Sequence, residues 1–200
     1  LVGLRFLRLP VVGEVVTGES RAISLYPAFN FVGARDSGDA AYLRGLDDVD
    51  FSVELGPGLS LRTGWLRAFV ELRYGITGHN GFVGDAGVDY VFRPTDRLSI
   101  SAGPRVSFAS TAYMDAYFGV TPAESAASGL RTFDPGAGVK DVGLGSLVEY
   151  VVTPKVRLYA EGTYSRFVFD AADSPIIDRG SEDQFTFGLG ITYRFGADVF

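Results

Sequence analysis

The chain has 200 residues, a formal net charge of −6 and no cysteine, with 46% apolar and 21% charged residues. This composition excludes a disordered chain, and the lack of cysteine excludes disulfides, zinc–thiolate sites and thiol catalysis. Basic residues are scattered singly rather than clustered, so nucleic-acid binding is not expected. The sequence has no run of 18 consecutive apolar residues, which excludes a membrane-spanning helix but leaves membrane-spanning strands open.

In chain order, residues 1–16 come first, with a mixed apolar run that Arg5 and Arg8 interrupt. We expect a weak strand at 3–9 and a turn region at 13–21. The following segments place an apolar residue at every second position, which predicts strands with one apolar and one small or polar face. There are eight of them, at residues 22–31, 49–62, 65–77, 82–93, 97–109, 142–152, 156–169 and 184–196. Pro27 lacks the N–H that a sheet uses, so we expect a bulge or kink there.

The last segment shows the alternation most clearly, with Phe185, Phe187, Leu189 and Ile191 on one face and Thr and Gly residues between them. Roughly ten residues tilted near 45° cross the hydrocarbon layer of a bilayer, so this length suits a membrane-spanning strand. A small barrel has little room inside. Eight strands cannot all send large apolar side chains inward, so we place the apolar faces against lipid and the polar faces in the lumen.

The connections between the segments alternate in length. They are short at 63–64, 94–96 and 153–155 and long at 35–48, 110–140 and 170–183, with the short turn at 78–81 as the exception. In the longest connection, Thr121-Pro122-Ala123-Glu124 has the form of a capping box and Gly129 is a stop signal, which predicts a helix over 122–128. Outer-membrane barrels have short periplasmic turns and long extracellular loops, so we expect a periplasmic C-terminus.

We therefore predict an all-β fold, namely a transmembrane antiparallel up-and-down β-barrel that forms one domain over residues 1–200. The chain begins at Leu1 without an initiator Met or a signal peptide, so we expect an N-terminally truncated or mature product. Eight clear strands and one weak strand make an odd number, whereas bacterial single-chain barrels have even numbers. We expect about ten to twelve strands in the intact protein.

Several sequence stretches carry a family resemblance. They are Y-M-D-A-Y-F-G-V-T from Tyr113, S-A-A-S-G-L from Ser125, G-A-G-V-K-D-V-G-L-G from Gly136, D-A-A-D-S-P-I-I from Asp170, Q-F-T-F-G-L-G-I-T-Y-R-F from Gln184, L-R-G-L-D-D-V-D at 43–50 and G-H-N-G at 78–81. Together they resemble the MltA-interacting protein family, MipA/OmpV. The motif loop of this resemblance contains Tyr113, Tyr117, Phe118, Gly119, Asp173, Ser174 and Pro175.

The resemblance implies a barrel in the outer membrane of a Gram-negative cell, in contact with lipid and lipopolysaccharide. For the family's namesake it implies a scaffold that joins a lytic transglycosylase to a penicillin-binding protein, and other members are described as adhesins or porin-like proteins. This chain continues for five residues beyond the Y-R-F where the family usually stops. Either Phe195 or Phe200 could then serve as the terminal aromatic that the assembly machinery reads.

The inward faces of the predicted strands carry charged residues. These are Glu54, Arg67, Glu71, Arg73, Asp85, Asp89, Arg105, Glu149, Arg157, Glu161 and Arg194. They fit either a selective pore or a lumen plugged by its own ion pairs, and we favour the plugged lumen because side chains fill small barrels. On the apolar faces the single charged residue is Arg166, near a strand end where it can reach the interface.

His79 is the only histidine, so a Ser-His-Asp site is conceivable only around it, with Ser101 or Ser107 and Asp85 as partners. The sequence Gly-His-Asn-Gly is a good turn in its own right, so we expect a turn and no enzyme. The acidic loop residues are Asp47, Asp48, Asp50, Asp170, Asp173 and Asp178, and we interpret them as solvated charge rather than as a calcium site. We expect no metal or cofactor.

Tyr113, Tyr117 and Phe118 fit either an aromatic belt at the membrane interface or a partner surface, and we favour the belt. The family resemblance implies the preferred hypothesis for function, a structural scaffold linked to peptidoglycan synthesis and turnover enzymes. The alternative is a porin-like channel or an adhesin that acts through the lumen or the extracellular loops.

Overall fold

The structure is a computed structural model that describes residues 3–4, 13–16 and 22–193. Its centre is one antiparallel sheet in which eight long strands each pair with the next strand along the chain. These strands are β3 (Ala22–Val32), β4 (Ser52–Arg62), β5 (Leu66–Gly75), β6 (Phe82–Thr95), β7 (Leu98–Ala109), β8 (Gly138–Thr153), β9 (Val156–Phe167) and β10 (Asp183–Tyr193). The short strands β1 (Gly3–Leu4) and β2 (Gly13–Val16) pair with the outer edge of β3. The predicted all-β, up-and-down antiparallel fold is confirmed.

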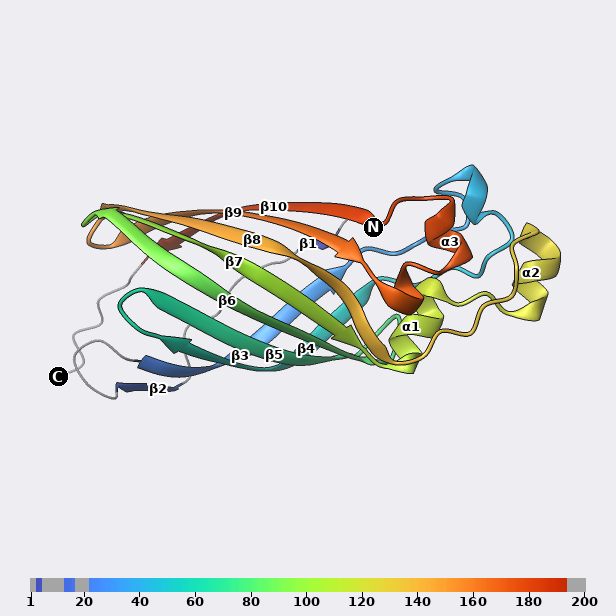
Figure 1. The fold of residues 1–200 in the computed structure, drawn as a ribbon, viewed down its shortest axis with the longest axis horizontal. Coiled ribbons are helices and arrows are strands. Elements are labelled where there is room, and N and C mark those ends of the chain that lie inside the picture. The colour runs from blue at the N-terminus through green and yellow to red at the C-terminus, as the bar shows by residue number, and fades with distance from the viewer. Residues whose placement is uncertain (1–2, 5–12, 17–21, 194–200) are drawn as a thin grey trace.

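The sheet curls into a half-barrel whose strands run obliquely to its long axis (Figure 1). Within the described residues β10 has one neighbouring strand, β9, and the two edges of the sheet do not pair with each other. Every helix lies at one end of the half-barrel, which we call the loop end. The other end carries the turns at 63–65, 96–97 and 154–155 and is called the short-turn end.

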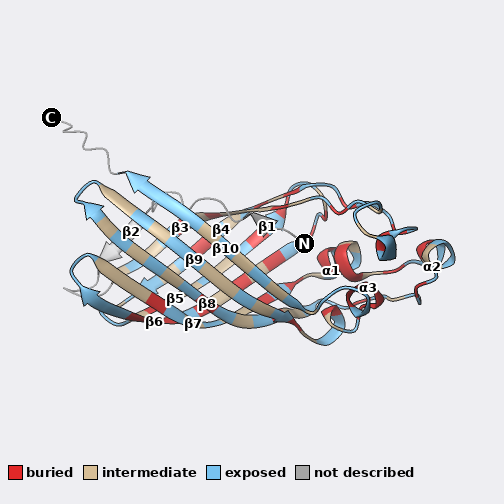
Figure 2. Ribbon diagram, turned by 90° about the horizontal axis from the view of Figure 1, so that it is seen from above, coloured by how far each residue is buried: buried red, intermediate tan, exposed pale blue. Residues whose placement is uncertain are grey.

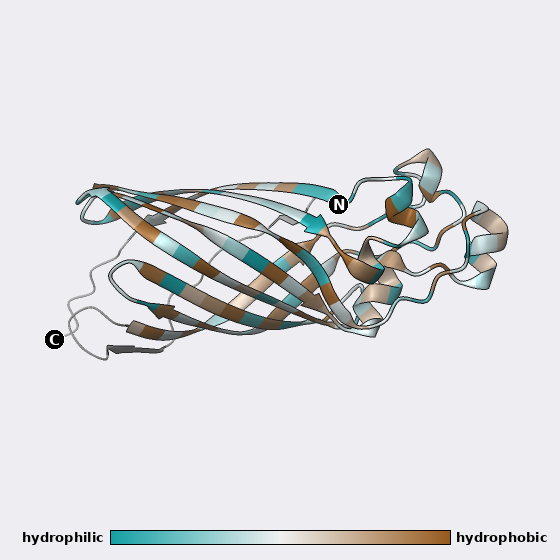
Figure 3. Cartoon of the chain, in the orientation of Figure 1, coloured by the Kyte–Doolittle hydropathy of each residue, from teal (hydrophilic) through white to brown (hydrophobic). Residues whose placement is uncertain are grey.

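Two different faces follow from the alternation of side chains along each strand. The outer face is apolar and exposed: Leu189 is 91% exposed, Phe187 81% and Leu144 63%. The inner face holds buried polar residues, among them Glu54 and Asp89. Figure 2 shows exposed positions alternating with less exposed ones along the strands, and Figure 3 shows hydrophobic, brown positions alternating with paler or teal ones. The prediction that the apolar face lies outside is confirmed.

Among the described residues, three α-helices and two 3-10 helices lie in the connections. They are α1 (Thr111–Phe118), α2 (Pro122–Ser128), α3 (Pro175–Asp178), η1 (Ala41–Leu43) and η2 (Phe169–Ala171). The predicted helix at 122–128 is confirmed, since Thr121 and Glu124 form a capping box and Gly129 has a left-handed φ of 73°. The sequence interpretation missed α1 and α3. None of the helices in the described part of the chain is long and apolar enough to cross a membrane.

Of the bulge or kink expected at Pro27, the bulge is wrong, because the register between β3 and β4 is uninterrupted and Pro27 lies opposite Pro57. Proline has no N–H to donate to a neighbouring strand. At opposed positions without hydrogen bonds between the two strands, the backbone nitrogens point away from the partner strand, so Pro27 and Pro57 can face each other. Register shifts occur instead near the ends of strands, for example between Phe92 and Thr95.

The start of the chain differs in part from the prediction. Residues 13–16, expected in a turn region, form β2. Of the weak strand expected at 3–9, β1 covers the first two residues, and 5–9 lie outside the described residues. Residues 49–51, expected at the start of the second long strand, precede β4, and Val49 instead forms an isolated bridge with Arg35.

Candidate functional site: the two ends of the lumen

A buried arginine organises the lumen near the loop end. Arg73 on β5 is 2% exposed, and its guanidinium contacts a carboxylate from each of three strands. Nε lies 3.0 Å from Glu54 Oε2, Nη1 lies 2.6 Å from Glu71 Oε2, and Nη2 pairs with Asp85. A buried charge is tolerated only when it is paired and hydrogen-bonded, so this cluster holds β4, β5 and β6 together from inside.

Neutral donors complete the coordination of these three carboxylates. Asn30 Nδ2 donates to Glu54 at 2.9 Å, Tyr26 donates to Glu71 at 2.9 Å, and Ser107 donates to Asp85 at 2.5 Å. These donors come from β3 and β7, on either side of the strands that carry the charges. The network therefore spans five neighbouring strands of the half-barrel.

A second cluster lies further toward the short-turn end, around Asp89 on β6. Asp89 is fully buried and lies between two arginines, with Arg67 Nη2 at 2.5 Å and Arg105 Nη1 at 2.6 Å. Arg105 also stacks its guanidinium over the ring of Phe69, at 5.2 Å from the ring centroid. The two clusters thus cover the inner faces of β4 to β7 with buried side chains.

His79 closes the first cluster from the loop side. It follows β5 in the turn at 76–81, yet its ring is 4% exposed and points back into the lumen. The Gly81 N–H donates to Nδ1 at 3.1 Å, so Nε2 carries the proton of the neutral ring and lies 3.3 Å from Glu54 Oε1. The ring packs against Tyr113 and Tyr117, at 4.6 and 5.7 Å between centroids.

Above His79, α1 covers the loop end of the lumen. Its buried residues Tyr113, Met114, Tyr117 and Phe118 are at most 7% exposed and belong to one apolar cluster. That cluster also includes residues from the ends of the strands and from the loops: Val32, Val49, Val83, Ala109, Phe167, Ala171 and Ile177. We call Tyr113, Met114, Tyr117 and Phe118 the α1 plug. Burial raises the pKa of both tyrosine hydroxyls, so they stay protonated at neutral pH.

Two loops fasten the α1 plug from outside. Arg35 donates through Nη1 to the Tyr117 carbonyl and through Nη2 to the Asp47 carbonyl, both at 3.0 Å. Ser174, which has no exposed surface, donates to the Phe118 carbonyl at 2.7 Å. The carbonyls of Tyr117 and Phe118 lie at the end of α1, where they have no partner within the helix, and Arg35 and Ser174 supply their hydrogen bonds. The plug is therefore anchored to loops on both sides of it in the sequence.

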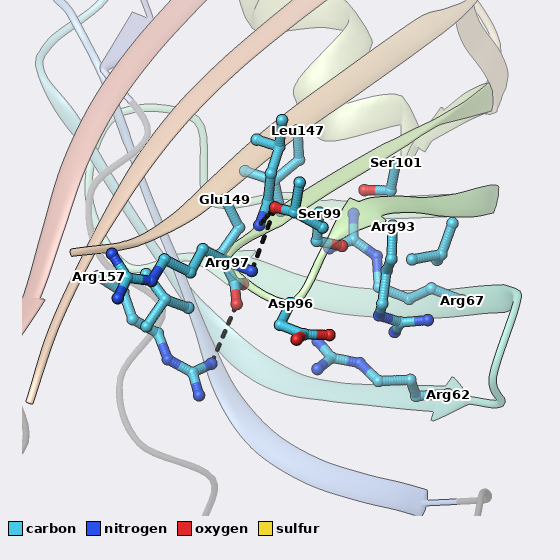
Figure 4. A pocket seen from close by; sticks show the side chains of 14 residues that line it. Arg62, Arg67, Arg93, Asp96, Arg97, Ser99, Ser101, Leu147, Glu149 and Arg157 are labelled. Atoms are coloured by element: carbon cyan, nitrogen blue, oxygen red, sulfur yellow. Dashed lines mark hydrogen bonds and ion pairs between the residues drawn. The ribbon is translucent and has the colours of Figure 1, made fainter. Parts of the chain in front are cut away.

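The short-turn end is built differently. There the lumen opens into a cavity of about 250 Å³ whose walls carry five arginines, Arg62, Arg67, Arg93, Arg97 and Arg157. The acidic residues in the same walls are Asp96 and Glu149, and Arg157 Nη1 lies 3.0 Å from Glu149 Oε1. Figure 4 shows these side chains converging from the ends of several strands. We call this cavity the arginine pocket.

The predicted lumen residues separate into groups. Glu54, Glu71, Arg73 and Asp85 form the first cluster, and Arg67, Asp89 and Arg105 the second. Glu149 and Arg157 pair in the arginine pocket. Glu161 on β9 is exposed and lies opposite Gly188 of β10, and Arg194 is outside the described residues. Arg166, expected near the interface, is paired with Glu182 and Asp183 beside the loop end.

The expected aromatic belt of Tyr113, Tyr117 and Phe118 is wrong. A belt residue lies on the outer surface at the height of the lipid headgroups. These three side chains instead lie in the apolar cluster of the α1 plug, because α1 places them on the side that faces the lumen. The sequence contained a hint, since Thr111 to Phe118 has helix-compatible residues, but its weak periodicity did not separate helix from loop.

The other motif residues support the plug. Gly119 ends α1 and its N–H donates to the carbonyls of Met114 and Asp115, where a Cβ would lie 2.6 Å from the Asp115 oxygen. Ser174 and Pro175 begin α3, and the exposed Asp173 offers its carbonyl to Arg131. The motif segments at 113–119 and 173–175 thus meet at the loop end.

The Ser-His-Asp arrangement considered around His79 is not formed. In the described structure His79 pairs with Glu54, whereas Ser107 donates to Asp85 and Ser101 lines the arginine pocket. Among the acidic loop residues, Asp48 accepts the Ser37 N–H at 2.6 Å and Asp170 accepts the Gly136 N–H at 2.7 Å. No group of three His, Cys, Asp or Glu residues suited to a metal occurs within the described residues.

Sequence reasoning missed two residues that hold the loops together. Arg35 was assigned to a polar loop, but it is 8% exposed and contacts α1. Glu124 was identified only as a capping residue, but it also accepts the Asp47 N–H at 2.9 Å. Burial alone would raise the pKa of the Glu124 carboxyl, but hydrogen bonds from the Asp47 and Thr121 N–H groups outweigh it and lower the pKa.

Comparison with known proteins identifies the family of this chain. The family model described as "MltA-interacting protein MipA" matches residues 6–195. The "MltA-interacting protein" of Escherichia coli K12 is 29% identical over 177 residues, which cover 87% of this chain and 68% of that protein. The "Putative outer membrane protein YiaT" of the same strain is 33% identical over 117 residues, covering 58% of this chain. The matched region spans about half of YiaT, 46% of its length. The chain belongs to the MltA-interacting protein MipA family.

Proposed function

We propose that this protein is an outer-membrane β-barrel that acts as a docking protein for peptidoglycan-processing enzymes, first of all a lytic transglycosylase of the MltA type. A relative is named for interaction with MltA, and another is named as an outer membrane protein. The exposed apolar face of the strands supports residence in a membrane, because a large exposed apolar surface is rarely left in water.

The observation that carries the proposal is the set of buried ion pairs on the inner face of the sheet. Two clusters cover the inner faces of β4 to β7, and the α1 plug covers the loop end. A porin needs a continuous water-filled passage, whereas these inner faces are covered by paired side chains of the chain itself. A barrel of this kind works through its surfaces, which favours docking over transport.

The proposal includes an orientation. Long loops on the cell surface and short turns in the periplasm are the usual arrangement of such barrels, so the short-turn end meets the periplasmic partner. Trp65, in the first short turn, is 61% exposed and offers an aromatic anchor of the type that dominates protein interfaces. We also propose that the barrel contacts lipopolysaccharide at the outer leaflet and that a penicillin-binding protein is a second periplasmic partner.

The test is a binding titration between this protein in detergent micelles and a purified MltA-type lytic transglycosylase. We expect saturable binding that Trp65→Ala weakens about tenfold or more, as for an aromatic interface anchor. Phe169→Ala is the matched control, since Phe169 is 70% exposed at the loop end. Planar-bilayer recordings accompany the titration. Stepwise currents together with no binding of the transglycosylase would refute the docking function and favour a channel.

A further inference from the structure

The arginine pocket concentrates positive charge in a protein whose net charge is −6. Five arginines and two acidic residues line this cavity of about 250 Å³. They come from different parts of the chain, with Arg62 at the end of β4, Arg67 on β5, Arg93 on β6, Arg97 in the turn before β7 and Arg157 on β9. The fold therefore assembles this charge at the short-turn end.

The arginines differ in how their charge is compensated. Arg67 is bound to Asp89, Arg157 to Glu149, and Arg93 donates to the carbonyl of Gly64. Arg62 and Arg97 are exposed, and within the described residues their guanidinium groups have no hydrogen bond or ion pair. Arg62 is also directly opposite Arg67 across the β4–β5 pair, and like charges at opposed positions repel. An anion bound here would relieve that repulsion.

The other residues in the pocket walls indicate which kind of anion would bind there. Ser99 and Ser101 add hydroxyl groups, and Val91, Leu147 and Val151 add apolar surface. A guanidinium forms paired hydrogen bonds to a carboxylate, and a neighbouring apolar wall accommodates an aliphatic group. The cavity is smaller than the roughly 300–1,000 Å³ of a typical small-molecule site. It fits the end of a chain rather than a complete bulky ligand.

We propose that the arginine pocket binds the carboxylates of a short acidic peptide segment that enters the lumen from the short-turn end. Arg62 and Arg97 supply the uncompensated charge, Ser99 and Ser101 donate hydrogen bonds, and the apolar wall holds the peptide's aliphatic groups. This inference deepens the proposed function and rests on it, because it names the chemistry of the partner segment that meets this end of the barrel.

The experiment uses the full chain in detergent micelles and a fluorescent peptide, Ala-Glu-Ala-Glu with a free C-terminus. Fluorescence anisotropy measures binding of this peptide and of its uncharged counterpart, Ala-Gln-Ala-Gln amide. We expect binding of the acidic peptide alone, with an affinity that falls as salt rises because exposed charges are screened. The double variant Arg62→Gln with Arg97→Gln weakens binding about tenfold or more, as expected for two lost charge-assisted contacts.

The matched control removes two exposed arginines at the loop end, Arg44→Gln with Arg179→Gln, and changes the net charge by the same amount. It is expected to leave binding unchanged. Urea unfolding of both double variants checks that each one is folded. Equal weakening in both variants, or equal binding of the uncharged peptide, would overturn the proposal. Competition by inorganic phosphate as strong as by the peptide would also overturn it, because the pocket would then be a general anion site.

The docking function and the peptide-binding pocket can be tested independently of each other. If the acidic peptide does not bind but the transglycosylase does, the docking function stands and the pocket assignment is wrong. If the peptide binds with the expected dependence on Arg62 and Arg97 while the transglycosylase does not bind, the pocket is confirmed and the partner is a different one. A transglycosylase titration with the Arg62→Gln, Arg97→Gln variant links the two, since a loss of binding there assigns the enzyme's docking to the pocket.

Discussion

The two ends of the lumen use the same inner faces of the same strands for different purposes. At the loop end, Arg73 is surrounded by three carboxylates and covered by the α1 plug, so its charge is fully compensated and shielded. At the short-turn end, arginines outnumber acids, and Arg62 and Arg97 remain exposed. Shielding from water therefore decides whether an inward charge stabilises the barrel or is available to a ligand.

The energetic reason lies in the cost of desolvation. A buried charge that loses its partner is left in a medium that cannot solvate it, whereas an exposed charge is solvated again by water. Replacing an arginine should therefore have a large effect on stability at the loop end and a small one at the short-turn end. Variants at the two ends test this difference.

Replacing Arg73 with Met keeps a long side chain but leaves Glu54, Glu71 and Asp85 without their shared cation. We expect the free energy of unfolding to fall by about 3–5 kcal/mol, the usual cost of breaking a buried ion pair. Urea unfolding in micelles, followed by circular dichroism, measures it. Arg157→Met is the control, because its pair with Glu149 is partly exposed and is worth at most about 1 kcal/mol. Equal losses in the two variants would show that the two ends do not differ.

Replacing Phe118 with Ala removes a side chain that is 1% exposed and packs edge-on against Phe167 at 5.0 Å. We expect the packing of the α1 plug to weaken by about 3 kcal/mol, in line with large-to-small substitutions in a core. Hydrogen exchange in α1 should accelerate.

The control for this substitution is Phe169→Ala, which removes a ring that is 70% exposed in the same loop region. Its effect should stay within about 0.5 kcal/mol, as for most surface changes. If Phe118→Ala leaves hydrogen exchange in α1 at the control level, α1 does not depend on the apolar cluster and the closed loop end has to be explained by other contacts.

Glu124 connects α2 to the loop at 35–51, and its contribution should depend on pH. Its folded pKa lies below the usual value of about 4.3, so its stabilising effect is complete above that value and is lost as the pH falls through the lowered pKa. The protection factors of the Asp47 and Thr121 amides, which correct for the intrinsic pH dependence of exchange, should therefore fall in acid. The effect is about 1 kcal/mol, the typical net worth of a hydrogen bond.

The Glu124→Gln variant tests the same contact without acid. A Gln side chain has one acceptor oxygen in place of two, so it cannot bind both amides, and exchange should already be fast at neutral pH. Glu182→Gln is the control, because its carboxylate pairs with the exposed Arg166 and is remote from these amides. An unchanged acid response in Glu124→Gln would assign the pH dependence to a different carboxylate.

The strands and their faces could be predicted because the information is local. Phe187 and Leu189 alternate with glycines, and any antiparallel barrel too small to hold such side chains inside must place them outside. The helix at α2 was also predictable, since Thr121, Glu124 and Gly129 specify its start and end within nine residues. Pro27 misled the prediction because its effect on the sheet depends on which residue lies opposite.

The loop end could not be predicted in this way. The position of Tyr117 depends on Arg35, which is 82 residues away, and the position of Phe118 depends on Ser174, which is 56 residues away. A reading limited to neighbouring residues assigned the aromatic side chains to the membrane interface. The structure places them over the lumen because several connections meet there and exclude water together.

A two-residue period specifies which segments cross the sheet, which side of each segment is apolar and which residues face inward, so these properties can be read from local sequence. Which inward charges compensate each other, and which remain available, depends on contacts between strands and loops that are distant in the chain. Arg73 on β5 and Arg62 at the end of β4 both lie on the inner face of the sheet. Their different surroundings arise from the register of neighbouring strands and from the plug over one end, and both are contacts between distant parts of the chain.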